Sequence, residues 1–183
     1  QFKNNKKKFY KFYQKEINFI KKIDFELKKK NIRLSILGKW QNYKIKSIEK
    51  KFYNLNGIKF IENFKGRKTF EIASKFEILI GYSSSTLTYE MLARKKKTIV
   101  LNRNYNDYPF NTKQFGYFCN LPKEGSFWVN SGNINKFMKV FNFLKKLSKK
   151  DWNNILKKNK KYTCEYNFLN KKLKIHIQSI LKN

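Results

Sequence analysis

Apolar residues recur along this chain with two different spacings, and these predict alternating helices and strands. From Phe9 to Leu27 they fall every three or four positions, which is typical of a long amphipathic helix. The expected strands are Asn31–Leu37, Ile58–Ile61, Phe76–Ile80 and Lys97–Leu101, and the expected helices between them are Tyr43–Tyr53, Lys68–Lys75 and one that starts after Ser84 or Ser85. Alternation of this kind predicts an α/β fold, a Rossmann-like parallel sheet with helices on both faces.

Beyond Asn102 the periodicity weakens into a loop rich in Tyr, Asn, Pro and Gly that extends through Asn133. Three helices are expected to close the chain, at Ile134–Leu147, Lys149–Asn159 and roughly Phe168–Leu181. The run from Ser148 to Asp151 resembles a capping box in which Asp replaces Glu. With 183 residues and no internal repeat, the chain is expected to form one domain, residues 1–183.

The turn between the third and fourth expected strands carries the clearest signal for a ligand site. Gly81 is followed, after one tyrosine, by a run of four hydroxyl residues: Ser83, Ser84, Ser85 and Thr86. The N–H groups of a first helical turn have no partner within the helix, and the helix dipole adds positive potential there. One hydroxyl is enough to cap a helix, so four favour a phosphate or nucleotide site built mainly from backbone N–H groups. A plain helix cap is the alternative.

The same turn opens a stretch, SSTLTYEMLARKKKTIVLN at residues 84–102, that resembles a known family. It is similar to the SSTLGYEALARGKKV pattern in the C-terminal half of O-antigen (lipopolysaccharide) biosynthesis proteins, which belong with the GT-B glycosyltransferases. Thr88 and Lys95 depart from that pattern, which has Gly at both positions. Weaker likenesses follow in matching order, at Leu34–Gly38, Phe60–Ile61, Arg67–Glu71, Phe115–Gly116 and Leu121–Trp128.

The resemblance implies the C-terminal, nucleotide-binding half of a GT-B-type glycosyltransferase of surface-polysaccharide assembly. Such a half binds a nucleotide-sugar donor as substrate, without a metal or other cofactor, and transfers sugar to a lipid-linked or glycan acceptor. In these enzymes the catalytic base usually comes from the N-terminal domain. Because this chain begins at Gln1, we expect that domain to be missing here, and no catalytic residue is assigned. A degenerate, inactive transferase is a further alternative.

Seven residues are expected to bind the donor nucleotide: Gly38, Arg67, Ser83, Ser84, Ser85, Thr86 and Glu90. By the resemblance, Glu90 would accept hydrogen bonds from the ribose hydroxyls; a surface pair with Arg94 at i,i+4 is the weaker alternative. Gly38 would let the backbone approach the donor, or simply end a strand. Arg67 stands where the family has an arginine and could neutralise the diphosphate.

Other catalytic chemistries find little support in this sequence. His176 is the single histidine, and its apolar neighbours Ile175 and Ile177 favour a structural role, so His-based acid–base chemistry is disfavoured within the chain. No Ser-His-Asp constellation is recognisable in the sequence. No GxxxxGK[ST] loop or GxGxxG motif occurs. Cys119 and Cys164 suit neither a disulfide scaffold nor a zinc site, and no apolar run approaches a membrane span. We therefore expect a cytoplasmic protein. The lipid-linked acceptor that the resemblance implies could also bring it to the inner face of the cell membrane.

The net charge of +31 is the strongest argument for a different function. It suggests a non-catalytic basic module that binds nucleic acid or anionic membrane. Against specific nucleic-acid binding, only four of the 43 basic residues are Arg, and the lysines are spread over every expected element. Lys, Asn, Ile, Phe and Tyr also share A/T-rich codons, so compositional drift explains much of the charge. The expected partners are a nucleotide-sugar, its acceptor and an anionic membrane surface.

Overall fold

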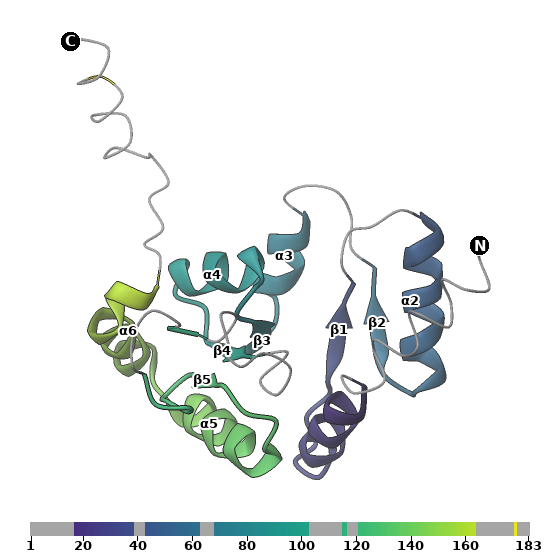
Figure 1. Cartoon of the computed structure of the whole chain (residues 1–183), viewed down its shortest axis with the longest axis horizontal. Helices are drawn as coiled ribbons and strands as arrows, with labels where there is room; N and C mark the ends of the chain where they lie inside the picture. The colour runs from purple at the N-terminus through teal and green to yellow at the C-terminus, as the bar shows by residue number, and fades with distance from the viewer. Residues whose placement is uncertain are drawn as a thin grey trace.

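Helices and strands alternate in the computed structural model, which describes residues 17–38, 43–62, 68–102, 115–116, 121–163 and 178 (Figure 1). A helix covers residues 17–28. The further elements are β1 Ser35–Leu37, α2 Tyr43–Leu55, β2 Lys59–Ile61, α3 Lys68–Ser74, β3 Leu79–Tyr82, α4 Thr86–Ala93, β4 Thr98–Leu101, β5 Trp128–Val129, α5 Ile134–Lys146, α6 Lys149–Lys158 and the short 3₁₀ helix η1 Lys160–Tyr162. This order confirms the predicted α/β class.

The strands are parallel, as predicted, but they form two sheets and not one. β1 pairs with β2, and β3, β4 and β5 form a second sheet in that order. No hydrogen bond joins β1 to β3 within the described part of the chain. Side chains from both sheets and from helix 17–28 line the space between them. Figure 1 shows α3 and α4 on one side of the larger sheet and α5 on the other, with α6 at the left end.

Three strand predictions need correction. The strand expected at Asn31–Leu37 is β1, which begins only at Ser35 because Asn31 closes the preceding helix. The strand expected at Phe76–Ile80 is β3, which begins at Leu79 and continues through Gly81 and Tyr82, so part of the expected turn is strand. β5 lies inside the segment expected to be a loop. It is only two residues long and buried on the sheet, where Val100 donates its N–H to the Phe127 carbonyl (2.8 Å). A pairing this short leaves no periodic signal in a sequence.

Three helices end with a residue in the left-handed conformation. These residues are Asn31 (φ 56°), Gly57 (φ 68°) and Lys95 (φ 61°). In each case the next residue donates its N–H to the carbonyl five residues back: Ile32 to Leu27 (3.0 Å), Ile58 to Tyr53 (3.1 Å) and Lys96 to Met91 (2.9 Å). This pattern is the Schellman motif, which glycine favours. At Lys95 the motif forms although a lysine replaces the glycine of the resembling pattern.

The buried side chains form two clusters, and helix 17–28 contributes to both. Its Ile17 and Ile20 pack with α2, whereas Ile23 and Leu27 belong to the larger cluster around β4, α5 and α6. All four residues of β4 are buried, as expected of a central strand. Trp152 of α6 is also buried and donates its indole N–H to the Lys95 carbonyl (2.9 Å), which fixes α6 against the end of α4.

Several predictions fall outside the described residues. These are Arg67, Cys119, Cys164 and His176, the start of the first expected helix, and the expected helix Phe168–Leu181 apart from residue 178. In the part of the chain that is described, no helix has the length and apolarity that crossing a bilayer requires.

Candidate functional site

The turn from Tyr82 to Thr86 leaves the start of α4 without a side-chain cap. Ser85 is the N-cap residue, with extended backbone (φ −100°, ψ 123°), but its hydroxyl accepts no N–H of the first turn. The Thr88 N–H reaches the Ser85 carbonyl (3.0 Å). Within the described part of the chain, the N–H groups of Thr86 and Leu87 have no hydrogen-bond partner. Unpartnered donors at a helix start are a ready anion site.

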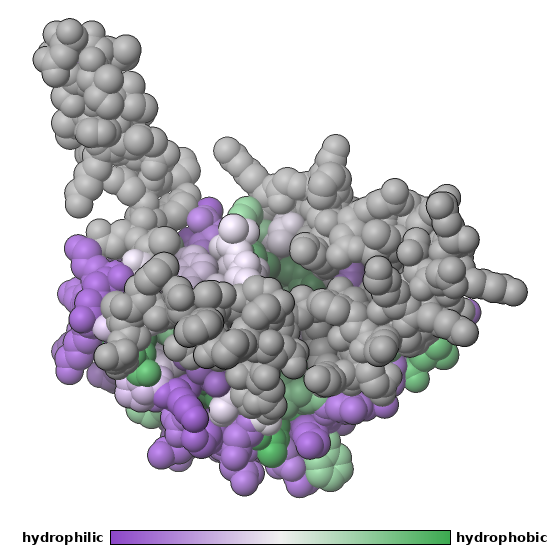
Figure 2. All heavy atoms as spheres, viewed as in Figure 1, coloured by the Kyte–Doolittle hydropathy of each residue, from purple (hydrophilic) through white to green (hydrophobic). Residues whose placement is uncertain are grey.

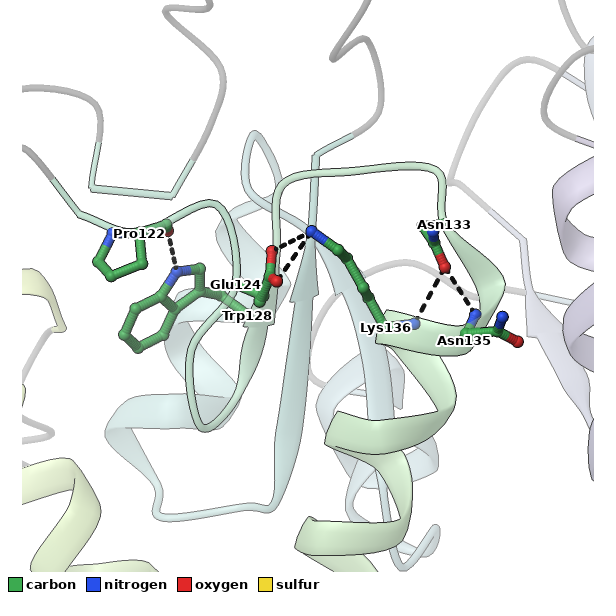
Figure 3. Close-up of polar contacts among 6 residues, drawn as sticks. All are labelled: Pro122, Glu124, Trp128, Asn133, Asn135 and Lys136. Carbon is green, nitrogen blue, oxygen red and sulfur yellow. Dashed lines mark hydrogen bonds and ion pairs between the residues drawn. The ribbon is translucent and has the colours of Figure 1, made fainter.

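The two helices that follow are capped instead. The Asn133 side chain accepts hydrogen bonds from the N–H groups of Asn135 (2.9 Å) and Lys136 (3.2 Å) at the start of α5 (Figure 3). At α6 the Ser148 hydroxyl accepts the Asp151 N–H (3.1 Å) and donates to the Asp151 carboxylate (2.5 Å), which confirms the predicted cap. Unlike these two helices, α4 keeps the donors of its first turn available for a ligand.

Next to this turn a cavity of about 820 Å³ lies between the two sheets. Gly38, which follows β1, and Ser84, Ser85 and Thr86, which follow β3, all line it. The walls are mainly apolar and come from helix 17–28, β1, β3 and α5. The structure thus brings four of the seven expected site residues to one cavity. A mostly apolar pocket with a few polar groups is typical of small-molecule sites.

Gly38 of the expected site and Gly81, which precedes the hydroxyl run, each have a packing role. A Cβ at Gly81 would collide with the Thr88 hydroxyl, so Gly81 allows α4 to lie close against β3. Thr88 is itself buried. A Cβ at Gly38 would likewise collide with the Phe60 ring of β2. Close packing therefore explains a glycine at each position, whether or not a ligand also approaches Gly38.

Glu90 and Ser83 are not among the residues that line the cavity. The Glu90 carboxylate accepts a hydrogen bond from Arg94 Nε at 2.7 Å, and both side chains are partly exposed. Arg94 also lies over the Phe70 ring of α3, 5.6 Å from its centroid. The Ser83 N–H extends the sheet by donating to the Leu101 carbonyl (2.8 Å). Roles for Glu90 and Ser83 in donor binding therefore remain predictions.

The ends of β4 and β5 add buried polar residues that the sequence analysis did not single out. Asn102 and Asn130 directly follow these strands and are 7% and 5% exposed. The Asn130 side-chain amide donates to the Phe115 carbonyl (3.2 Å) and accepts from the Phe115 N–H (3.1 Å). In the sequence, the one hint of these residues was that each asparagine directly follows a stretch of apolar residues. This amide holds the 115–116 turn at the end of β5.

The segment Leu121–Trp128 folds back along β5 as a tight turn (Figure 3). The Trp128 indole N–H donates to the Pro122 carbonyl (3.0 Å), and Gly125 donates its N–H to the Trp128 carbonyl (3.0 Å). A Cβ at Gly125 would collide with the Trp128 ring. Glu124 then pairs with Lys136 of α5 at 2.8 Å. The segment thus links β5 to the first turn of α5.

No cluster of three or more His, Cys, Asp or Glu side chains that could hold a metal ion occurs among the described residues.

Searches of curated proteins and of solved structures found no match. A family model, described as "putative O-antigen biosynthesis protein", matches residues 1–181. This match spans nearly the whole chain, and the chain therefore belongs to that O-antigen biosynthesis family.

Proposed function

We propose that this chain is the donor-binding part of a metal-independent glycosyltransferase of the GT-B type, which assembles O-antigen or a related surface polysaccharide. Membership of the O-antigen biosynthesis family supports the pathway. The parallel α/β fold and the open turn at α4 support a nucleotide-sugar as the ligand. The acceptor would be lipid-linked or a glycan, and the catalytic base would come from outside this segment.

One observation carries the proposal: the free N–H groups at the start of α4 lie at the cavity that Gly38 also lines. A diphosphate placed there would accept hydrogen bonds from Thr86 and Leu87 and lie at the positive end of the helix dipole. A charge at a helix end gains about 0.3–1 kcal/mol from the dipole, and up to ~2 kcal/mol when partly buried. The Arg67 side chain would add a positive charge to the same anion.

These groups would also promote the reaction. When the sugar leaves the nucleotide-sugar, negative charge develops on the nucleoside diphosphate. Backbone N–H groups that already point toward that charge stabilise it without a metal. The hydroxyls of Ser83, Ser84 and Ser85 can supplement the backbone donors. Glu90 would accept the two ribose hydroxyls after releasing Arg94, an exchange that forfeits only ~0.3–0.5 kcal/mol, the usual value of an exposed helical pair.

Calorimetric titration of the full-length protein with UDP, GDP, CDP and TDP tests the proposal. At least one nucleotide should bind, and Glu90→Ala should weaken that binding. Glu26→Ala is the matched control, because it also removes a carboxylate from a surface pair, with Lys29 at 2.8 Å. Absence of binding by all four nucleotides up to millimolar concentration would contradict the proposal.

Thr86→Pro tests the backbone donors directly. Thr86 is the first residue of α4, a position where proline is well tolerated, and the extended Ser85 before it is compatible with proline. The variant should therefore fold normally but lose one N–H, weakening nucleotide binding about tenfold or more. Lys149→Pro, at the first residue of α6, is the control and should bind as wild type. Equal affinity of all three proteins would show that the turn is only a helix start.

A further inference from the structure

Two neighbouring helices each expose one phenylalanine between lysines on the side that faces away from the core. On helix 17–28 this residue is Phe25, 61% exposed, with Lys21 and Lys22 one turn before it. On α5 it is Phe143, 42% exposed, with Lys139 one turn before and Lys146 one turn after. We call these six residues the Phe–Lys face.

The two helices lie side by side. The Phe19 and Phe137 rings meet edge to face with their centroids 6.3 Å apart, and Ile23 of helix 17–28 shares a core cluster with Phe141 of α5. Because these inner residues pack on a common core, the exposed residues of both helices lie on neighbouring parts of the outer surface. Figure 2 shows hydrophilic side chains interrupted by hydrophobic ones along the lower rim, where Figure 1 places these helices.

The Phe–Lys face is strongly positive. Asp24 and Glu26 are neutralised by Lys28 (2.6 Å) and Lys29 (2.8 Å) on helix 17–28. The four lysines of the face itself form no ion pair within the described part of the chain, and α5 contains no acidic residue. A single exposed phenylalanine is ordinary. Here two exposed phenylalanines lie on adjoining helices, and each is flanked by lysines without an ion-pair partner among the described residues. This combination suits a surface with an anionic outer layer and an apolar layer just beneath it.

We propose that the Phe–Lys face docks on a membrane that contains anionic lipid. The lysines would contact the headgroups while the phenylalanine rings enter the interfacial region, as in amphipathic helices that lie on membranes. Nucleic acid is the other polyanion to consider, but the face has no arginine for base-edge contacts, and a duplex offers no apolar layer for the two phenylalanine rings. This proposal concerns a surface separate from the donor turn and does not depend on nucleotide binding there.

Vesicle co-sedimentation at about 0.15 M salt tests the face. Wild-type protein should bind vesicles of phosphatidylglycerol and phosphatidylcholine in equal parts, and bind pure phosphatidylcholine far less. A variant with Lys21, Lys22, Lys139 and Lys146 changed to Gln should lose at least about a hundredfold in partitioning, since each lysine near such a surface contributes roughly fivefold. Phe25→Gln with Phe143→Gln should lose about tenfold, because less apolar area is buried.

The matched control removes the same charge from α6, by changing Lys149, Lys150, Lys157 and Lys158 to Gln, all four of which are exposed. This control should bind vesicles almost as wild type. Equal losses in the two quadruple variants would overturn the proposal, because they would mean that net charge alone drives binding. Tight binding of a short DNA duplex at this salt, lost in the face variant while vesicles remain unbound, would also overturn it. Nucleotide titration of the face variant should match wild type, which keeps this test separate from that of the donor turn.

Discussion

Replacing Lys95 by glycine should raise the free energy of unfolding, although the change removes a side chain and adds no contact. Lys95 has φ 61°, the left-handed conformation that closes the Schellman motif of α4. This conformation costs a residue with a Cβ about 1–2 kcal/mol. Glycine avoids that strain but loses about 0.5–1 kcal/mol more conformational entropy on folding. The expected net gain is therefore about 0.5–1 kcal/mol.

Two features of the structure sharpen this estimate. The Lys95 side chain is exposed, so its removal forfeits little packing. The Lys95 carbonyl accepts the Trp152 indole N–H at 2.9 Å, and glycine keeps that backbone acceptor in place. The gain should appear in urea unfolding as a higher midpoint with an unchanged slope, and in heating as a rise of about 1–4 °C in Tm.

Lys95→Ala and Asn31→Gly are the informative controls. Alanine keeps the Cβ and should leave stability near that of wild type. Asn31 also has a left-handed backbone (φ 56°), but asparagine tolerates it better, so its replacement by glycine should gain only a few tenths of a kcal/mol. If Lys95→Gly destabilises the protein while Lys95→Ala does not, the strain argument is refuted.

Three further changes test the packing around the candidate site and one shifted ionisation. Gly81→Ala should destabilise by about 1–3 kcal/mol, because its Cβ meets the Thr88 hydroxyl, and Thr88→Ala should restore part of this loss in the double variant when both are measured by urea unfolding. Asn130→Ala should cost about 2–3 kcal/mol, since both polar groups of Phe115 lose their partner, and should increase hydrogen exchange at Phe115. Burial lowers the pKa of Lys96 below its usual 10.5, so in alkaline solution below pH 10.5 the unfolded state binds more protons than the folded state. As the pH is raised from neutral to 10.5, the free energy of unfolding of wild type should therefore rise relative to that of Lys96→Met.

The sequence predicted those parts of the fold that depend on local pattern. α5 and α6 have the apolar spacing of amphipathic helices and begin at Asn133 and Ser148, residues whose side chains cap them. The parallel α/β class followed from the alternation of strands and helices. β5 was missed because two residues carry no periodicity, and the partners that hold it come from β4 and the preceding loop.

Only the part of the candidate site that lies in one contiguous stretch of sequence was predictable. The run Ser83–Thr86 marked the start of α4, and the structure places most of it at a cavity. The Asn130–Phe115 and Glu124–Lys136 contacts join residues 15 and 12 positions apart, which no local pattern identifies. Glu90 shows the limit in another way, because the same carboxylate fits a ribose contact and a pair with Arg94, and spacing alone cannot choose between them.

Helix 17–28 has a mechanical consequence for the cavity beside it. It packs on α2 through Ile17 and Ile20 and on the larger core through Ile23 and Leu27, so it spans both halves of the molecule. Within the described residues no strand ladder joins the two sheets, so side-chain packing on this helix sets the width of the gap between β1 and β3. Packed side chains can slide by small shear movements without breaking backbone hydrogen bonds. The gap can therefore widen or narrow around a ligand while every strand pair stays intact.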